Sequence, residues 1–374
     1  MSWKFWQRAR LVPDVEIEPL PQSHPAEVVG RVFLEEPRVF SVGRERILRG
    51  RLRYDSPADR ARFTAALEPL HVSHYFERVN GTTLATVTHP EPPTLPREWP
   101  MNLALFLTTV VTTLWAGAVM EGAPFDFFLR DLGGFARGIP FSASLMGILT
   151  AHELGHYVAA RRYGLNVTLP FFIPLPFPPI GTLGAVIKMR TPIYSRRMLL
   201  DVGAAGPIAG MAVAIPVAIA GILGSPVLPI EGSGGIRLGE PLLFQALVAL
   251  FAPAHPSTHD LYLNSIAFAG WIGFFVTALN MLPLGQLDGG HVLYALLGRG
   301  QHRIAWLFFL ALLVMGWWWQ GWYLWAVLIL LVIKVKHPPV LDPQIELDPR
   351  RRLAGWLAVL LFIGCFVPVP FALM

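Results

Sequence analysis

The sequence predicts an α-helical polytopic membrane protein of about seven transmembrane helices, with a re-entrant β segment and a small N-terminal α+β domain. The first observation is composition: 53% of the 374 residues are hydrophobic and 15% are charged, which is too apolar for an ordinary soluble domain. The second is the length of the apolar runs, several of which approach or exceed the roughly 20 residues that span a bilayer. The third is the position of the basic residues beside these runs.

Arginines indicate how the chain crosses the membrane. They cluster at 161–162, 196–197 and 350–352, so the formal net charge of +5 reflects topology, and we expect no nucleic-acid partner. Arg161 and Arg162 place the end of the second span on the cytoplasmic side. The N-terminus is then cytoplasmic too, because the chain crosses the membrane twice between the N-terminus and these arginines. With no cleavable signal or transit-like segment in the first hundred residues, we expect a prokaryotic plasma membrane, with a thylakoid membrane second.

Residues 1–98 are expected to form the soluble domain, ending in a proline-rich linker at 90–100. Residues 28–34 and 47–54 alternate between apolar and polar side chains, as strands do. Residues 56–67 have the pattern of a helix, and residues 74–87 have the pattern of a hairpin. The helix has Ser56 as N-cap and Pro57 at its first position. The hairpin turns at Asn80 and Gly81. The scattered histidines here form no catalytic cluster.

Residues 99–374 are expected to form the transmembrane domain. Its apolar runs lie at 101–120, 138–160, 198–223, 261–282, 303–334 and 353–371. The run at 303–334 is long enough for two short spans, broken near Gln320 and Gly321 with a tryptophan belt at the interface, which brings the count to seven. In the outside loop before the fourth span, residues 242–252 are too short to span and are expected in the interface.

The segment 169–190 is apolar but contains five prolines, a density that excludes a helix. Extended backbone at membrane depth persists only where it is buried in protein or lines a wet cavity. We therefore interpret this segment as a re-entrant loop and strand, the strand lying at 181–188. A cytoplasmic loop that is merely apolar is the alternative.

A metal-binding pattern lies towards the end of the second span. His152 and His156 are four residues apart, so on a helix they share a face, and Glu153 lies beside them. Two neutral imidazoles at this spacing suit a zinc ion, and the glutamate is placed to take a proton from zinc-bound water. The alternative is a pair of structural histidines at a membrane surface. The cost of an ionisable cluster in an apolar helix argues against it.

Asp288, after the fourth span, is the third candidate ligand. Two crossings separate it from His156, so both lie on the same side of the membrane. An apolar setting makes an unpaired carboxylate costly, and a zinc ion on two neutral histidines supplies its partner. Three protein ligands leave one position open for water, which is the catalytic arrangement. His291 is an alternative ligand, although a supporting or surface role is favoured.

Three motifs occur in order: His152-Glu153-Leu154-Gly155-His156, Gly206-Pro207-Ile208-Ala209-Gly210, and the stretch 280–291. Together they resemble the site-2 protease family of intramembrane zinc metalloproteases, over a core of about residues 139–291. The resemblance implies that His152, His156 and Asp288 bind one Zn2+ and that Glu153 is the catalytic base. It also implies that Asn280 helps to hold the substrate or the transition state; a helix–helix hydrogen bond is the alternative.

The segment around Gly181 resembles the family's membrane-embedded β region. A protease attacks an extended peptide, and an edge strand can hold an unwound substrate segment. We therefore expect Gly181, Thr182, Leu183 and Gly184 to contact the substrate. The chain departs from some members because it has no insertion large enough for a PDZ domain and no CBS pair. It is most similar to the minimal-core branch with an N-terminal soluble domain, such as the plant chloroplast and cyanobacterial members.

The sequence thus predicts zinc-dependent intramembrane proteolysis, with cleavage in or near a transmembrane segment of a membrane-protein substrate. That substrate and membrane lipid are the expected partners. The alternative is a non-proteolytic membrane-protein binder or metal-handling protein on the same fold. Retention of three ligands together with Glu153 argues against it, because a scaffold has no need of a base.

Overall fold

The computed structural model describes residues 15–17, 25–42, 45–70, 72–79, 81–89, 98–129, 131–191, 193–229, 236–254, 256, 258–340 and 346–373. Contacts divide the chain into two compact units. The N-terminal unit comprises Met1–Trp99, Val158–Leu169 and Lys188–Tyr194, and the helical unit comprises Pro100–Tyr157, Pro170–Ile187 and Ser195–Met374. The domain boundary expected near residue 98 stays a prediction.

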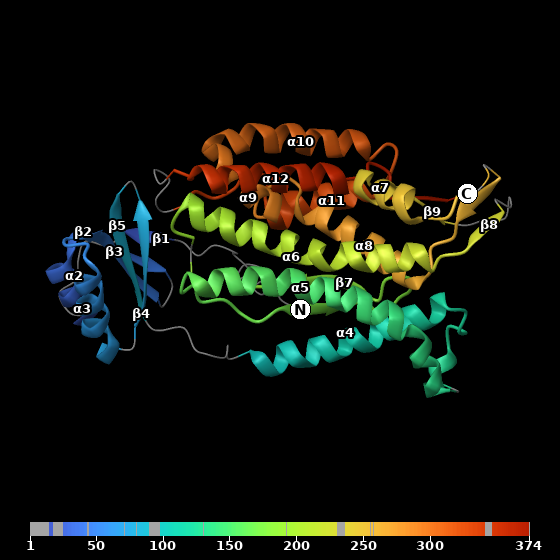
Figure 1. The fold of residues 1–374 in the computed structure, drawn as a ribbon, viewed down its shortest axis with the longest axis horizontal. Helices are drawn as coiled ribbons and strands as arrows, with labels where there is room; N and C mark the ends of the chain where they lie inside the picture. Colours follow the sequence, from blue (N-terminus) through green and yellow to red (C-terminus); the bar gives the residue numbers. More distant parts are fainter. Residues whose placement is uncertain are drawn as a thin grey trace. The chain divides into compact units, whose positions relative to one another are not determined.

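A five-stranded antiparallel sheet forms the centre of the N-terminal unit, in the order β1-β2-β3-β5-β4 (Figure 1). Its strands are β1 (Val15–Ile17), β2 (Leu34–Val42), β3 (Glu45–Leu52), β4 (Ser73–Val79) and β5 (Thr82–His89). Helices α2 (Pro25–Phe33) and α3 (Pro57–Leu67) pack on the sheet, and α3 ends in a 3-10 turn, Glu68–Leu70. Phe63 and Leu67 of α3 are fully buried against Leu48 and Val87 of the sheet.

The strand predicted at 28–34 is wrong, because these residues form α2 and the first residue of β2. The apolar pattern also fits a helix: Val29 and Phe33 are four residues apart, and both pack on the buried core. Pro25 is the first helical residue and Glu27 lies in the first turn. Both features favour a helix start.

Other expectations for this unit are confirmed. β3 covers most of the predicted strand. Ser56 caps α3 by accepting the Asp59 N–H at 3.1 Å, and the Asp59 carboxylate accepts the Ser56 N–H in return. β4 and β5 pair across Gly81, whose φ is +80°. Asn80 and the prolines at 90–96 lie outside the described residues.

Two segments from much later in the chain belong to the N-terminal unit. Tyr194 is fully buried, with its ring stacked on Tyr75 at 6.1 Å and the Arg49 guanidinium 5.6 Å from its centre. Tyr163 meets Tyr75 edge-on at 5.9 Å. The buried charge of Arg49 is balanced by Glu77 at 3.0 Å. Burial raises the pKa of Tyr75 to about 12, so its hydroxyl stays neutral in this stack.

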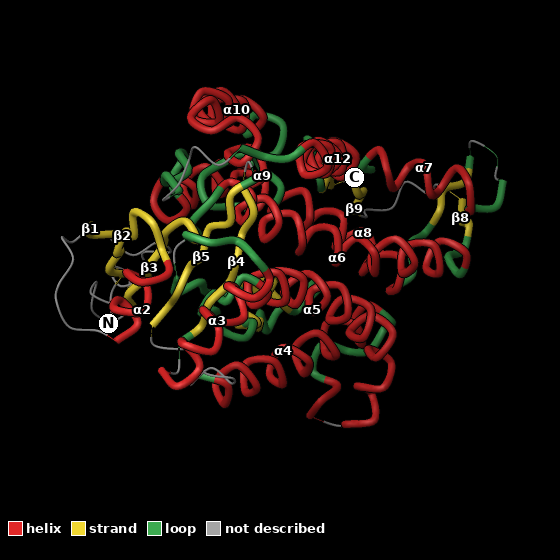
Figure 2. Tube along the Cα trace, turned by 60° about the vertical axis from the view of Figure 1, so that its left-hand side comes forward, coloured by secondary structure: helices red, strands yellow, loops and turns green. Residues whose placement is uncertain are grey.

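Within the described residues, three helices are long and apolar enough to cross a membrane: Trp99–Met120 (α4), Leu132–Arg162, which ends in α5 (Ile139–Arg162), and Arg196–Leu223 (α6). Shorter helices are α7 (Leu242–Phe251), α8 (Ser265–Asn280), α9 (Asp288–Leu297), α10 (Gln301–Met315), α11 (Gly321–Leu328), a π-helical turn (Ile329–Ile333) and α12 (Pro349–Cys365). Helix predominates along the chain (Figure 2). A mostly helical membrane protein is therefore confirmed at this coarser level.

α6 lies at the centre of the helical unit and packs against α8, α9 and α12. Small residues let α6 and α8 approach closely: a Cβ on Gly221 would lie 2.2 Å from the Ala267 nitrogen, and one on Gly270 would lie 2.8 Å from the Ala218 Cα. Inside a membrane the hydrophobic effect does not drive helices together, because lipid is as apolar as the side chains. Close packing of this kind stabilises their association instead. This packing holds the elements that carry the site.

Extended segments complete the helical unit. β6 (Phe171–Pro174) and β7 (Thr182–Val186) form an antiparallel pair, so the strand predicted at 181–188 is confirmed for its central residues. Two further pairs join β8 (Val227–Pro229) to β10 (His259–Leu261), and β9 (Ile236–Leu238) to β11 (Phe371–Leu373). The last predicted span is helical only as far as Cys365, because Pro368 and Pro370 cannot continue a helix.

Candidate metal centre

Two histidines of α5 and the first residue of α9 converge inside the helical unit. His152 Nε2 lies 3.2 Å from His156 Nε2 and 3.2 Å from Asp288 Oδ2, and His156 Nε2 lies 3.3 Å from the same carboxylate oxygen. Both histidines are buried and Asp288 is half-buried. In the part of the chain that the structure describes, this is the one cluster of three such residues with metal-binding spacing.

The spacing and chemistry of these donors fit a zinc ion. Ligands about 2.1 Å from a tetrahedral zinc lie about 3.4 Å from one another, close to the observed separations. A neutral imidazole has a single N–H, and His156 directs its Nδ1 at the Val202 carbonyl, 2.8 Å away. Its Nε2 therefore offers a lone pair to the centre, in the orientation that such a carbonyl imposes on metal-binding histidines.

Glycines give α5 and α6 the close approach that the centre needs. A Cβ on Gly206 would lie 2.0 Å from His156 Nε2, and one on Gly210 would lie 3.1 Å from the His152 Cβ. On the opposite helix, a Cβ on Gly155 would lie 2.5 Å from a carbonyl oxygen of α6. Gly206 and Gly210, four residues apart on α6, thus make room for the two histidine rings.

A tight turn between α8 and α9 brings Asp288 to the histidines. A Cβ on Gly289 would lie 1.9 Å from the Met281 carbonyl oxygen, and one on Gly290 would lie 2.3 Å from the Gly285 carbonyl oxygen. Gly285 itself has a φ of +50°, which glycine adopts most readily. The two glycines after Asp288 therefore let the chain fold back on itself and begin α9 at the carboxylate.

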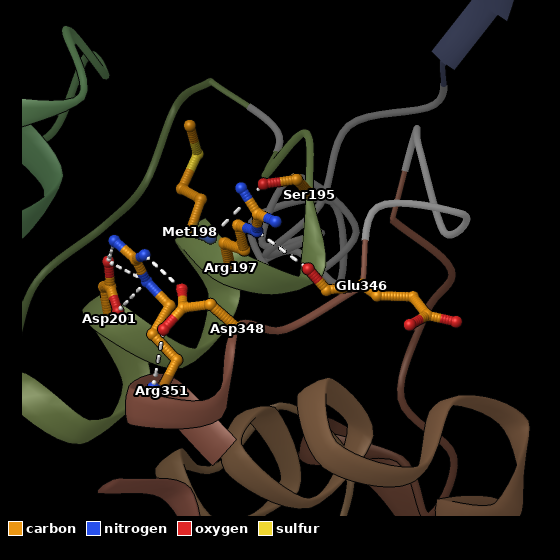
Figure 3. Close-up of polar contacts among 7 residues, drawn as sticks. All are labelled: Ser195, Arg197, Met198, Asp201, Glu346, Asp348 and Arg351. Carbon is orange, nitrogen blue, oxygen red and sulfur yellow. Dashed lines mark hydrogen bonds and ion pairs between the residues drawn. The ribbon is translucent and has the colours of Figure 1, made fainter. Parts of the chain in front are cut away.

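Ion pairs and a hydrogen bond join the start of α6 to the chain that enters α12 (Figure 3). One of the residues involved, Asp201, directly precedes Val202, whose carbonyl orients the second histidine. Arg351 of α12 donates to Asp201 of α6 at 2.8 Å and to Asp348 at 2.6 Å. Asp348 also caps α12. Arg197 donates to the Glu346 carbonyl at 2.7 Å, so two arginines join α6 to the chain entering α12. The sequence did not predict these contacts, because Arg351 and Asp201 are 150 residues apart.

Glu153 lies in the same turn of α5 as His152 and is only 5% exposed. It is not one of the three converging residues, so its carboxylate is free to act on a bound molecule. The backbone N–H of Ile187, directly after β7, faces this carboxylate. The structure therefore places the candidate base between the histidines and the β segment.

Asn280 and His291 both lie close to the centre but in different ways. Asn280, the last residue of α8, has its Nδ2 3.3 Å from His152 Nε2, so its amide borders the space between the donors. His291 directs its Nδ1 away, to His337 Nε2 at 2.7 Å, and it is absent from the metal-type cluster found among the described residues. Nothing in the sequence marked His337.

The four predicted substrate-contacting residues lie at the start of the β7 strand. Gly181 and Gly184 have φ values of +77° and +99°, and Gly181 is bonded through its carbonyl to the Thr112 hydroxyl at 2.7 Å. Thr182 is buried, whereas Leu183 is 68% exposed. The turn into β7 is therefore held by α4 while an apolar side chain stays accessible beside it.

Fold and centre together define a class: a helical membrane protein with a buried centre of two histidines and one aspartate, and with a glutamate next to it. Residues 140–316 match the model of peptidase family M50. This match and the curated relatives confirm the resemblance to the site-2 proteases that was read from the three motifs.

Curated relatives agree with the family. The chain is 27% identical to probable zinc metalloprotease EGY1, chloroplastic, of Arabidopsis thaliana over 62% of the chain and 43% of that protein. Its identity is also 27% to EGY1 of Oryza sativa subsp. japonica, over 77% and 53%, and to EGY2 of Arabidopsis thaliana, over 63% and 42%. The chain thus spans about half the length of the curated relatives it matches. No solved structure matches it significantly.

Proposed function

We propose that the chain is a zinc-dependent intramembrane protease that hydrolyses a peptide bond in or near a transmembrane segment of a membrane-protein substrate. The observation that carries this proposal is the buried Glu153 beside three converging zinc-type donors. A structural metal site needs no such base. The family domain and relatives named as probable zinc metalloproteases support the same activity.

The residues have separate roles in this reaction. His152, His156 and Asp288 would hold the zinc, which when bound supplies a Lewis acid that acidifies water and polarises a carbonyl. Glu153 accepts the water proton on a carboxylate oxygen and passes it to the leaving nitrogen. The Asn280 amide, 3.3 Å from His152 Nε2, donates to the oxygen that becomes negative during attack.

The proposed topology has about seven spans, a re-entrant β segment and a cytoplasmic N-terminus. Arginines at the ends of α5 and the start of α6 support it, because basic residues favour the cytoplasmic side. A prokaryotic plasma membrane is the compartment we propose. The relatives are named chloroplastic, which keeps a thylakoid membrane as the second choice.

Removing zinc should stop proteolysis, and restoring it should recover activity. Purified protein would be treated with a chelator, then given one equivalent of zinc, while cleavage of a model transmembrane peptide is followed by mass spectrometry. Cleavage that survives complete zinc removal would contradict the proposal. Full zinc loading with no cleavage of any membrane substrate tested would favour the non-proteolytic alternative.

We further propose that β7 binds the substrate by strand addition. Within the described residues β7 has β6 as its strand partner on one side, and the Ile187 N–H that follows it meets Glu153. An unwound substrate paired with β7 would be extended beside the base. Main-chain hydrogen bonds would supply the affinity.

Leu183→Pro should lower cleavage about fivefold or more without releasing zinc, because proline removes a main-chain donor and a bond of this kind contributes about 1 kcal/mol. Leu183→Ala keeps the N–H and is the matched control, with cleavage within about threefold of wild type. The measurements are cleavage rate and zinc per chain. Equal cleavage by the proline variant and wild type would exclude strand addition here.

A further inference from the structure

A short stretch of chain after α11 lies directly against the turn that carries Asp288. We name residues 334–338 the strap. The Gly285 N–H in the turn donates to the Val335 carbonyl of the strap at 2.9 Å. A Cβ on Gly285 would lie 2.0 Å from the Lys334 carbonyl oxygen, so the two backbones touch with no side chain between them.

His337 connects the strap to α9. It is 4% exposed, its Nε2 lies 2.7 Å from His291 Nδ1, and its ring stacks on Tyr294 at 4.4 Å and 26°. Its Nδ1 donates to the Pro338 carbonyl, so its Nε2 is the unprotonated nitrogen and accepts from His291. Burial lowers the pKa of His337 to about 2, which keeps this ring neutral.

Gln301 joins the strap to the turn a second time. This side chain, at the start of α10, is fully buried. Its Nε2 donates to the Pro283 carbonyl in the turn at 3.1 Å, and its Oε1 accepts the His337 N–H at 3.4 Å. The neighbouring His302 donates to the His337 carbonyl at 3.0 Å. The residue at 337 therefore bonds directly to His291, after Asp288, and through Gln301 to Pro283, before it.

We propose that His337 is a positioning residue for the metal centre. Through His291 of α9, and through Gln301 of α10, which bonds to the turn before α9, it holds Asp288 facing the two histidines. The histidines have their own support from α5 and α6, so loss of the strap contacts would move the aspartate alone. The inference rests on the proposed function for its zinc, and it adds a residue about fifty positions from the aspartate.

The test is zinc affinity of the full-length protein in detergent, measured by competition with a chromogenic chelator and without substrate. His337→Phe keeps the ring on Tyr294 but cannot accept from His291. Loss of contacts that support metal ligands typically weakens binding 10- to 100-fold, and that weakening is expected here. His337→Gln supplies an acceptor oxygen and is expected within about threefold of wild type.

A matched control removes a buried ring hydrogen bond elsewhere in the helical unit. Trp322 of α11 donates its ring N–H to the Pro368 carbonyl at 2.7 Å, and Trp322→Phe should leave zinc affinity unchanged even where it lowers thermal stability. Wild-type affinity in His337→Phe would overturn the inference. Equal weakening in the Phe and Gln variants would overturn it too, because the acceptor would then not matter.

The same measurements separate this inference from the proposed function. Zinc binding that responds to position 337 in a protein without proteolytic activity would leave the strap role standing and remove only the protease. A wild-type protein that binds no zinc would overturn both.

Discussion

Glu153→Gln should abolish proteolysis while leaving zinc bound. Glutamine has the shape of glutamate and can still accept the Ile187 N–H that faces this position, but it cannot take a proton from water. Loss of a general base typically costs 10²- to 10⁴-fold in rate, so we expect the turnover number to fall at least about a hundredfold. Zinc should remain at one per chain, because Glu153 is outside the three-residue cluster.

This prediction is checked by measuring zinc content and cleavage of a model transmembrane substrate on the same preparation. Glu240→Gln, which makes the same change at an exposed position, is the matched control and should cleave as wild type does. Equal rates for the Glu153 variant and wild type would remove this residue from the mechanism. Loss of zinc from the variant would instead make it a ligand or a support for one.

Gly206→Ala should empty the metal centre. Its Cβ would lie 2.0 Å from His156 Nε2 and 2.4 Å from Cδ2, and the ring has little freedom to move because its Nδ1 is held by the Val202 carbonyl. Alanine favours helix by about 1 kcal/mol over glycine, so local propensity alone would stabilise the variant. A loss of zinc would therefore report the contact with the ring.

Two other glycines provide a graded comparison for this prediction. Gly210→Ala brings a Cβ to 3.1 Å from His152, a distance that a small shift relieves, so we expect most zinc to be retained. Gly147→Ala on α5 meets nothing within 4 Å and should be neutral. Metal analysis after purification and thermal unfolding measure the series. Full zinc in Gly206→Ala would show that the helices adjust freely.

The centre could be predicted largely because its chemistry is local. Helical periodicity places His152 and His156 on one face, and a carboxylate in an apolar setting requires a partner. The structure brings Asp288 to 3.2 Å from His152 as these arguments expect. The roles of these residues in catalysis stay predictions until the variants are measured.

The supports of the centre could not be predicted, because they depend on tertiary contacts. Val202 acts through its carbonyl, which no side-chain pattern reveals. His337 lies 46 residues from its partner His291. α9 has two glycines directly after its first residue, and these weaken any helical signal. In the N-terminal unit the alternation at 28–34 predicted a strand, but residues 28–33 form part of a helix whose Val29 and Phe33 pack on the core.

The stack of Tyr194 on Tyr75 affects where fragments and chimaeras of this protein can begin and end. Because Tyr163 and Tyr194 complete the aromatic cluster around Tyr75 and Arg49, the N-terminal unit is discontinuous in sequence. A fragment ending at residue 98 would leave Arg49 and Tyr75 without the rings that cover them. Chimaeras between relatives would keep this cluster intact only if residues 158–169 and 188–194 were exchanged together with the first 99.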